Sequence, residues 1–267
     1  MRVKANGKLN LALFVTGSRG GLHTLDGVMH SVDLGDELEI TESAEVRVTM
    51  RGAECDEKKN TAYRAATLVK ERYGLALSAD IIKRLPVGGG MGGSSADAAG
   101  VLVAAERLLG RDLTDLGAEA GSDVPFMMRG GCARVSGTGD ELERRAPLSF
   151  TALVVNCGQV DTAACYREFD RMGHDGGDPT AAIGDVCRGI FPRAPFNALL
   201  APARALQPRI AECEELAKAH GMSIYLTGSG GCMFVPDAPR GAEELFSAAG
   251  FGCFTVRSAA TGVEFLA

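Results

Sequence analysis

Two spacings of apolar residues divide the chain into a β-rich beginning and a mixed remainder. Period-two alternation at 36–40 and 45–50 predicts two short strands, which the polar turn between them joins as a hairpin. Helical spacing then predicts a helix over 60–73, and alternation predicts a strand over 77–85 that leads into a run of glycines. A further helical face follows the glycines and ends at Gly110, because glycine commonly terminates a helix.

No segment of the second half of the chain repeats a segment of the first. A polar stretch that contains Pro147 precedes a new apolar strand, so we place a boundary between two domains, 1–148 and 149–267. The order of the later elements fits a split β-α-β, or ferredoxin-like, arrangement with inserted helices. We expect strands at 151–156, 223–227, 231–235 and 252–257, and helices within 162–205, at 207–220 and at 240–249. The expected fold class is α+β.

Composition and charge narrow the class of protein. The 267 residues are 46% hydrophobic, which is enough for a substantial core. The net charge is −6 and no stretch is strongly basic, which argues against a nucleic-acid partner. The first residues have no apolar signal core, and no run of about 18 apolar residues occurs. These features predict a cytoplasmic protein without a membrane partner.

The cysteines and histidines do not suggest a metal centre. The eight cysteines are scattered without a CxxC pair, and the four histidines lack metal-ligand spacing. An even number of cysteines also permits disulfides, but without a secretory signal we interpret them as reduced core residues. The cysteines are at 55, 132, 157, 165, 187, 213, 232 and 253, and the histidines at 23, 30, 174 and 220.

The most informative segment is the glycine loop at 86–99, which runs into an alanine-rich helix. Glycines allow the backbone to approach an anion, and the N–H groups and dipole of the following helix favour negative charge. The segment therefore predicts a phosphate-binding loop. The alternative is a glycine-rich turn that Ser94 or Ser95 caps. A Walker A loop is excluded, since Gly93 and not lysine precedes Ser94.

The loop also matches a dinucleotide-binding pattern. Gly88, Gly90 and Gly93 satisfy GxGxxG, and Asp112 or Asp115 lies about 20 residues beyond. These aspartates follow a helix in a polar segment without a second strand, which argues against that interpretation. A protein-kinase loop is disfavoured as well, because no HRD or DFG motif follows.

Three further motifs carry candidate chemistry. Alternation near the start places Lys8, Asn10 and Ala12 on one strand face and the neighbouring leucines on the other; the alternative is a solvated face. Asp123 precedes a Val-Pro turn, where it is either a general base or an Asx-turn or helix-cap residue. The small residues 227–231 form either part of a binding site or a simple hairpin.

In this order the four motifs resemble those of the GHMP kinases, a family of sugar and isoprenoid small-molecule kinases. The stretches 15–17, 21–25 and 33–36 add to the likeness, which covers most of the chain. The resemblance implies a two-domain fold, with an N-terminal domain like ribosomal protein S5 and a ferredoxin-like C-terminal domain. It also implies phosphorylation of an alcohol by ATP with Mg²⁺. The nearest likeness is to members of the non-mevalonate isoprenoid pathway, whose acceptor is a polyol linked to cytidine diphosphate.

The resemblance also assigns roles to residues of this chain. Leu22 stands where the family usually has an aromatic that stacks on cytosine, so we expect Phe196 to stack instead. Lys8 and Asp123 are the expected catalytic pair, and Ser95 is the expected contact to Mg²⁺. The expected ATP-binding residues are Asn60, Pro86, Gly88, Gly89, Gly90, Met91, Gly92, Gly93, Ser94 and Ser95, and the expected substrate-binding residues are Asn10, His23, Phe196, Thr227, Gly228 and Ser229.

Two other functions compete with this one. Another GHMP kinase, which acts on homoserine or mevalonate, would not need His23 to read cytosine. A nucleotide-binding regulator without turnover would not need the pair Lys8 and Asp123. The expected partner is a small molecule, and the chain is expected to be a monomer or a homodimer.

Overall fold

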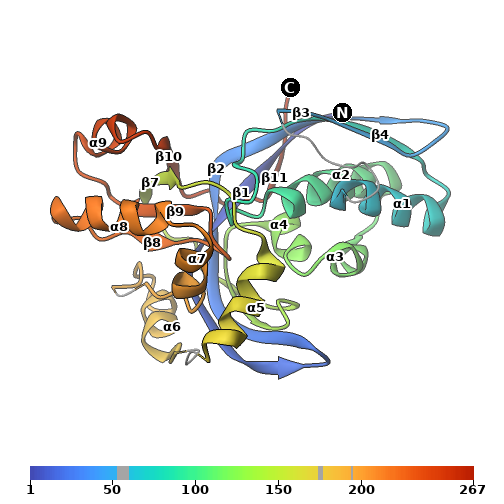
Figure 1. Cartoon of the computed structure of the whole chain (residues 1–267). Helices are drawn as coiled ribbons and strands as arrows, with labels where there is room; N and C mark the ends of the chain where they lie inside the picture. The colour runs from blue at the N-terminus through green and yellow to red at the C-terminus, as the bar shows by residue number, and fades with distance from the viewer. Residues whose placement is uncertain (53–59, 174–176, 194) are drawn as a thin grey trace.

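Two β-sheets organise the residues that the computed structural model describes, which are 1–52, 60–173, 177–193 and 195–267 (Figure 1). In the larger sheet the strand order is β11-β1-β2-β4-β3. The strand β5 also pairs with β2, and β6 pairs with β5. These strands are β1 (Arg2–Arg19), β2 (Leu22–Glu42), β3 (Arg47–Arg51), β4 (Leu77–Ile82), β5 (Cys132–Gly137), β6 (Glu141–Arg145) and β11 (Val263–Phe265).

The long hairpin of β1 and β2 depends on a two-residue turn. Arg19 pairs with Leu22, so Gly20 and Gly21 alone form the turn. Their φ angles are +60° and +81°, which glycine adopts without strain and which match the twist of a hairpin. This hairpin was not predicted from the sequence, although its two adjacent glycines were an available signal.

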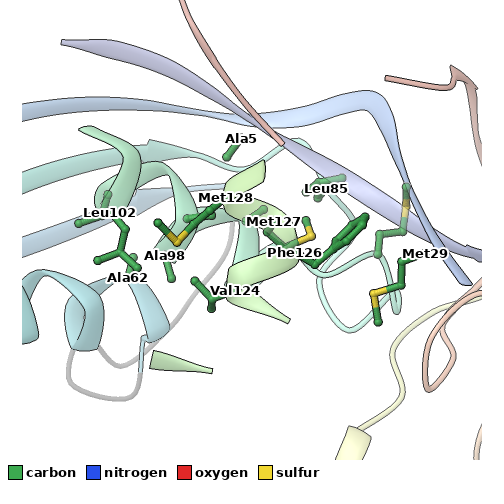
Figure 2. Close-up of a cluster of buried hydrophobic side chains, with 14 of the residues drawn as sticks. Ala5, Met29, Ala62, Leu85, Ala98, Leu102, Val124, Phe126, Met127 and Met128 are labelled. Carbon is green, nitrogen blue, oxygen red and sulfur yellow. The ribbon is translucent and has the colours of Figure 1, made fainter. Parts of the chain in front are cut away.

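Four helices cover the larger sheet and form the main hydrophobic core with it. In Figure 1 these helices gather on one side of β3 and β4. Figure 2 shows Leu102, Val124 and Phe126 of the helices within one buried cluster that also contains Ala5 and Met29 of the strands. The helices are α1 (Thr61–Tyr73), α2 (Gly93–Leu109), α3 (Thr114–Ala120) and α4 (Val124–Arg129).

The second sheet is antiparallel and has the order β10-β7-β9-β8. This is the predicted ferredoxin-like arrangement. The predicted inserted helices lie between its first two strands in the sequence. Its strands are β7 (Thr151–Asn156), β8 (Tyr225–Leu226), β9 (Cys232–Pro236) and β10 (Gly252–Arg257). The helices of this half are α5 (Thr162–Met172), α6 (Thr180–Cys187), α7 (Leu200–Leu206), α8 (Arg209–Ala219) and α9 (Ala242–Ala248).

The chain returns to the first sheet at its end, since β11 pairs with β1 through Val3 and Phe265. The division into 1–148 and 149–267 stays a prediction. The helix predicted over 60–73 and the helix predicted to end at Gly110 are both present.

The predicted hairpin of 36–40 and 45–50 is wrong. The strand β4 lies between β2 and β3, antiparallel to the first and parallel to the second. Alternation of apolar and polar residues shows that a segment has the two different faces of a strand. It does not show which strands will lie beside that strand in the sheet. Consequently the two segments form strands, and the pairing between them does not occur.

The cysteines follow the prediction in part. Of the seven that the structure describes, five are buried, but Cys187 is exposed and Cys253 is partly exposed. The interpretation as core residues is therefore wrong for Cys187. Cys55 and His174 lie outside the described residues. Within the described ranges, no helix combines the length and apolar character that crossing a bilayer requires.

We expect Phe126→Ala to lower the free energy of unfolding by about 3–5 kcal/mol, because the ring is fully buried in the main core. Phe265→Ala is the matched control at a ring that is 40% exposed, with the Arg107 guanidinium 4.4 Å above it. This control is expected to lower the free energy of unfolding by about 1 kcal/mol or less. Denaturant unfolding measures both, and equal losses would contradict this account of the core.

Candidate active site

A cavity of about 1230 Å³ lies between the β1–β2 hairpin, the glycine loop, α5 and the turn that follows β8. Its wall includes segments that are far apart in the sequence. Most of the predicted site residues line it: Lys8, Asn10, His23, Asn60, Pro86, Gly88, Gly89, Gly90, Gly92, Gly93, Ser94, Ser95, Asp123, Gly228 and Ser229. Met91, Phe196 and Thr227 do not.

The glycine loop ends in an uncapped helix. Gly92 is the N-cap of α2, with φ +75°, and no side chain caps the first turn. Ser94 and Ser95 lie inside that turn and line the cavity. The alternative of a turn capped by these serines is therefore excluded. The first turn instead presents backbone N–H groups and a positive helix dipole toward the cavity wall, which suits an anion.

The glycine loop packs backbone to backbone against the turn at 227–231. The backbone N–H of Cys232 donates to the Gly89 oxygen (3.1 Å), and the Thr227 hydroxyl donates to the Gly90 oxygen (3.4 Å). A Cβ on Gly90 would lie 2.1 Å from the Thr227 oxygen. The turn thus joins β8 and β9, as the hairpin alternative required, and also holds the loop.

Thr227 and Asn197 hold the turn at 227–231 in place. Thr227 is fully buried, and its hydroxyl oxygen accepts from the Asn10 backbone N–H (3.0 Å). The Asn197 side chain donates to the oxygens of Leu226 (3.0 Å) and Gly228 (2.8 Å). Thr227 and Asn197 therefore support the turn that forms part of the cavity wall, but they do not line the cavity themselves.

Lys8 and Asn10 face the cavity from β1 and are 3% and 4% exposed. The Lys8 ammonium donates to Asn10 Oδ1, which also accepts from the Gly228 N–H (3.0 Å). Both side chains are buried, so the alternative of a solvated strand face is wrong. Burial lowers the pKa of Lys8, and the negative charge of Asp123 opposes that shift.

The predicted alternation along β1 fails beyond Asn10. A bulge between Asn10 and Ala12 shifts the register against β2. As a result Leu13 lines the cavity, whereas Ala12 packs with Phe14 and Ala182. The prediction that Ala12 shares a face with Lys8 is therefore not met, because an extra residue in a bulge reverses the faces that follow it.

Asp123 is partly buried at the start of α4, and its side chain does not cap that helix. It lines the cavity together with Lys8. The helix-cap alternative is thus excluded. The carboxylate is left near an ammonium group, which is an arrangement that can receive a proton from a bound hydroxyl.

His23 lies near the tip of the hairpin, where α5 provides its partners. Its ring stacks on Tyr166 with centroids 4.8 Å apart, and its Nε2 lies 2.7 Å from Asp170 Oδ1. Tyr166 and Asp170 are four residues apart, so they share one face of α5, and both line the cavity. Burial raises the pKa of the Tyr166 phenol, and the charge of Asp123 adds to the rise.

Phe196, the residue that was expected to stack on the cytosine ring, does not lie where the prediction placed it. Phe196 stacks on Phe14 with centroids 4.8 Å apart, and its ring is not part of the cavity wall. Leu22 lines the cavity but is 63% exposed. Tyr166 is the aromatic ring that lines the cavity beside His23. The sequence analysis missed it, although the helical spacing of 162, 166 and 170 was an available signal.

Asn60 and Met91 have structural contacts of their own. The Asn60 side chain accepts from the Ala62 N–H (2.8 Å) and so caps α1 at the edge of the cavity. The Met91 side chain is buried in the main core, and its carbonyl oxygen accepts from the Lys8 N–H (3.0 Å). Met91 thereby fixes the strand that carries Lys8.

A buried charge cluster behind the glycine loop was also missed. The Lys83 ammonium bonds to carboxylate oxygens of Asp36 and Asp97, the latter at 2.7 Å. Burial raises the pKa of Asp97, partly offset by Lys83. Lys83 and Asp97 line the cavity. The signal available in the sequence was a charged residue at each end of the loop.

We expect the pKa of Lys8 to lie below 10.5, because burial disfavours its charged form. Asp123→Asn removes a charge that favours the ammonium, so it should lower the pKa of Lys8 further. NMR titration of ¹⁵Nζ-labelled lysine measures both values. Asp115→Asn, on a residue outside the cavity wall, is the control and should leave Lys8 unchanged. A pKa that rises or stays fixed in Asp123→Asn would refute the coupling.

We expect Gly90→Ala to abolish binding of a non-hydrolysable ATP analogue, measured by titration calorimetry. The new Cβ would meet the Thr227 oxygen and displace the loop. Gly110→Ala is the matched control, with a φ of +66° and nothing within 4 Å of the added carbon. It should cost about 1–2 kcal/mol of stability through backbone strain, with binding retained. Unchanged binding in Gly90→Ala would be evidence against a phosphate-binding loop.

Known proteins resemble this chain in sequence and in fold. Residues 60–131 match the family described as GHMP kinases N terminal domain. A 4-diphosphocytidyl-2-C-methyl-D-erythritol kinase of Streptomyces avermitilis is 36% identical over 252 residues, which cover 85% of this chain and 84% of that protein. One of Bacillus licheniformis is 34% identical over 250 residues and 86% of each chain.

Solved structures give the same result. A crystal structure of 4-(cytidine 5'-diphospho)-2C-methyl-D-erythritol kinase superposes with a TM-score of 0.79 at 30% identity, covering 97% of this chain and 99% of that one. A homoserine kinase from Cytophaga hutchinsonii has a TM-score of 0.73 at 18% identity, covering 100% and 97%, and shares the fold. On this evidence the chain belongs to the GHMP kinase family, in the group of the 4-diphosphocytidyl-2-C-methyl-D-erythritol kinases.

Proposed function

We propose that this protein transfers a phosphoryl group from ATP to the 2-hydroxyl of 4-diphosphocytidyl-2-C-methyl-D-erythritol, in the non-mevalonate pathway to isoprenoid precursors. The observation that carries the proposal is a single cavity lined by the glycine loop, by Lys8 and Asp123, and by His23. The glycine loop offers a site for phosphates, Lys8 and Asp123 form a catalytic pair, and the His23 ring can contact a nucleobase. The relatives' function supports the same substrate.

In this mechanism the glycine loop and the first turn of α2 hold the phosphates of ATP. The uncapped N–H groups of that turn fit an anion there. Mg²⁺, when bound, would neutralise charge on the phosphates. The hydroxyl of Ser95 is the proposed protein contact to it. Among the described residues, no group of three His, Cys, Asp or Glu side chains could hold a metal ion.

Asp123 and Lys8 then act on the acceptor. An alcohol attacks poorly while it keeps its proton, so Asp123 receives that proton as the hydroxyl oxygen attacks. The Lys8 ammonium stabilises the negative charge that develops, and Asn10 holds the ammonium in position. Most of the rate gain in phosphoryl transfer comes from positioning and charge stabilisation, so both residues contribute.

The other end of the cavity would bind the cytidine group. His23 would hydrogen-bond the edge of the base, with its ring fixed by Tyr166 and Asp170. We assign the stacking role to Tyr166 in place of Phe196, which stacks on Phe14. Gly228 and Ser229 would approach the phosphates or the polyol. The cytoplasmic location, and a monomeric or homodimeric state, also remain predictions.

A coupled assay of ADP release identifies the substrate. We expect turnover with 4-diphosphocytidyl-2-C-methyl-D-erythritol and none with homoserine or mevalonate. Turnover of either of those compounds instead would overturn the proposed acceptor. Binding of ATP without turnover of any of the three would support a nucleotide-binding regulator.

We expect Asp123→Asn to lower kcat by about 10²-fold or more with the fold intact, since the amide cannot accept the proton of the hydroxyl. The control is Asp115→Asn, in the first turn of α3 and outside the cavity wall, which should keep the activity. Steady-state kinetics and circular dichroism on both variants provide the comparison. Near-normal turnover in Asp123→Asn would remove Asp123 from its role as general base.

A further inference from the structure

Three charged side chains meet in the protein interior behind the glycine loop. They are Asp36 on β2, Lys83 just after β4 and Asp97 on α2, and their side chains are 0%, 6% and 1% exposed. The Lys83 ammonium bonds to Asp36 and to Asp97. We refer to these three residues as the ion triad.

The ion triad holds both ends of the glycine loop. Asp36 Oδ1 accepts from the backbone N–H groups of Arg84 (2.6 Å) and Leu85 (2.9 Å), which lead into the loop. Asp97 lies in the helix that leaves it. Lys83 bonds to both carboxylates and therefore links the entry of the loop to its exit and to the central strand β2.

The first turn of α2 packs directly on Lys83. A Cβ on Gly93 would lie 3.2 Å from the Lys83 Nζ and 3.9 Å from Asp36 Oδ2. Gly93, Ser94 and Ser95 form this turn, and all three line the cavity. A shift of the ammonium group would therefore move the turn that faces the cavity.

Stability alone does not account for the ion triad. Buried ion pairs are often replaced by apolar residues without loss of stability, because desolvation offsets the attraction between the charges. This cluster also contains one more acid than base. Within the described part of the chain, the buried Asp97 Oδ1 has no hydrogen-bond partner. Such an arrangement is unfavourable for folding and needs another reason.

We propose that Asp36, Lys83 and Asp97 are positioning residues, which fix the first turn of α2 so that its N–H groups bind the phosphates of ATP. They act through the backbone of the loop; Lys83 and Asp97 also line the cavity, and direct contact with the nucleotide is the alternative that Asp97→Leu tests. The inference rests on the proposed function, because it takes ATP as the ligand of the loop.

The test uses the double variant Lys83→Met/Asp97→Leu, which removes an opposite pair of charges and leaves Asp36 with its two backbone donors. We expect its Kd for a non-hydrolysable ATP analogue with Mg²⁺ to rise about 10-fold or more, since small misplacements of binding groups are costly. The KM for the acceptor should stay within about twofold, which separates loop positioning from general damage.

A matched control removes another ion pair. Arg134 and Asp26 join β5 to β2 through two contacts of 2.9 and 2.7 Å, outside the cavity wall. The variant Arg134→Met/Asp26→Leu should bind the ATP analogue as the wild type does, whatever its melting temperature. If both double variants lose affinity alike, or if the triad variant retains wild-type affinity, the proposal is overturned.

Asp97→Leu alone distinguishes positioning from direct contact. It leaves Lys83 paired with Asp36, so the charges remain balanced and the variant is the milder test should the double variant not fold. If Lys83 only positions the loop, Asp97→Leu weakens ATP binding, and Asp97→Asn, which keeps an acceptor for Lys83, restores it to within about threefold. If Asp97→Leu binds more tightly than the wild type, Lys83 contacts the phosphates and the proposal is wrong.

Binding by the wild-type protein is measured first, without the acceptor. Absence of binding there would refute the proposed function, and the inference with it. Wild-type binding with no effect in the triad variants would refute the inference alone. The two failures are therefore distinguishable.

Discussion

The backbone contact between the glycine loop and two segments of the second half, around Val160 and at 227–232, is the constraint on which the cavity depends. The carbonyl oxygens of Gly88 and Gly89 accept from the N–H groups of Val160 (3.2 Å) and Cys232 (3.1 Å). These bonds require the two backbones to approach so closely that a side-chain carbon has no space. The two halves of the protein thus meet through glycines, and the cavity wall forms where they meet.

This contact also determines which side of the glycine loop can face an anion. The carbonyl side of the loop is occupied by the second half of the protein, so its N–H side, at the start of α2, is left for an anion. Lys8 approaches from β1, whose backbone is bonded to Met91 in the same loop. Because burial lowers its pKa, Lys8 depends on nearby acceptors and on Asp123 to remain charged.

Local patterns in the sequence were sufficient for most elements and for part of the residues that line the cavity. Helices such as 61–73 and the order of elements after 150 follow from apolar spacing and glycine stops. Strand pairing and register could not be predicted, since the edge position of β3 depends on the later strand β4 and the bulge after Asn10 depends on how β1 pairs with β2. Tyr166 and Lys83 were missed because their partners, His23 and Asp36, lie far away in the sequence.

Helix α5 couples the two ends of the cavity. Its Tyr166 stacks on His23 near the hairpin tip, while the hydroxyl of Thr162 lies 2.8 Å from that of Ser229, in the turn that holds the glycine loop. A two-stranded ribbon is weakly stable alone, so the tip of the hairpin needs this helix to keep His23 in place. Any movement of α5 would change the proposed base site and the proposed phosphate site together. Residues of one helix therefore contact both the proposed base site and the turn that holds the loop.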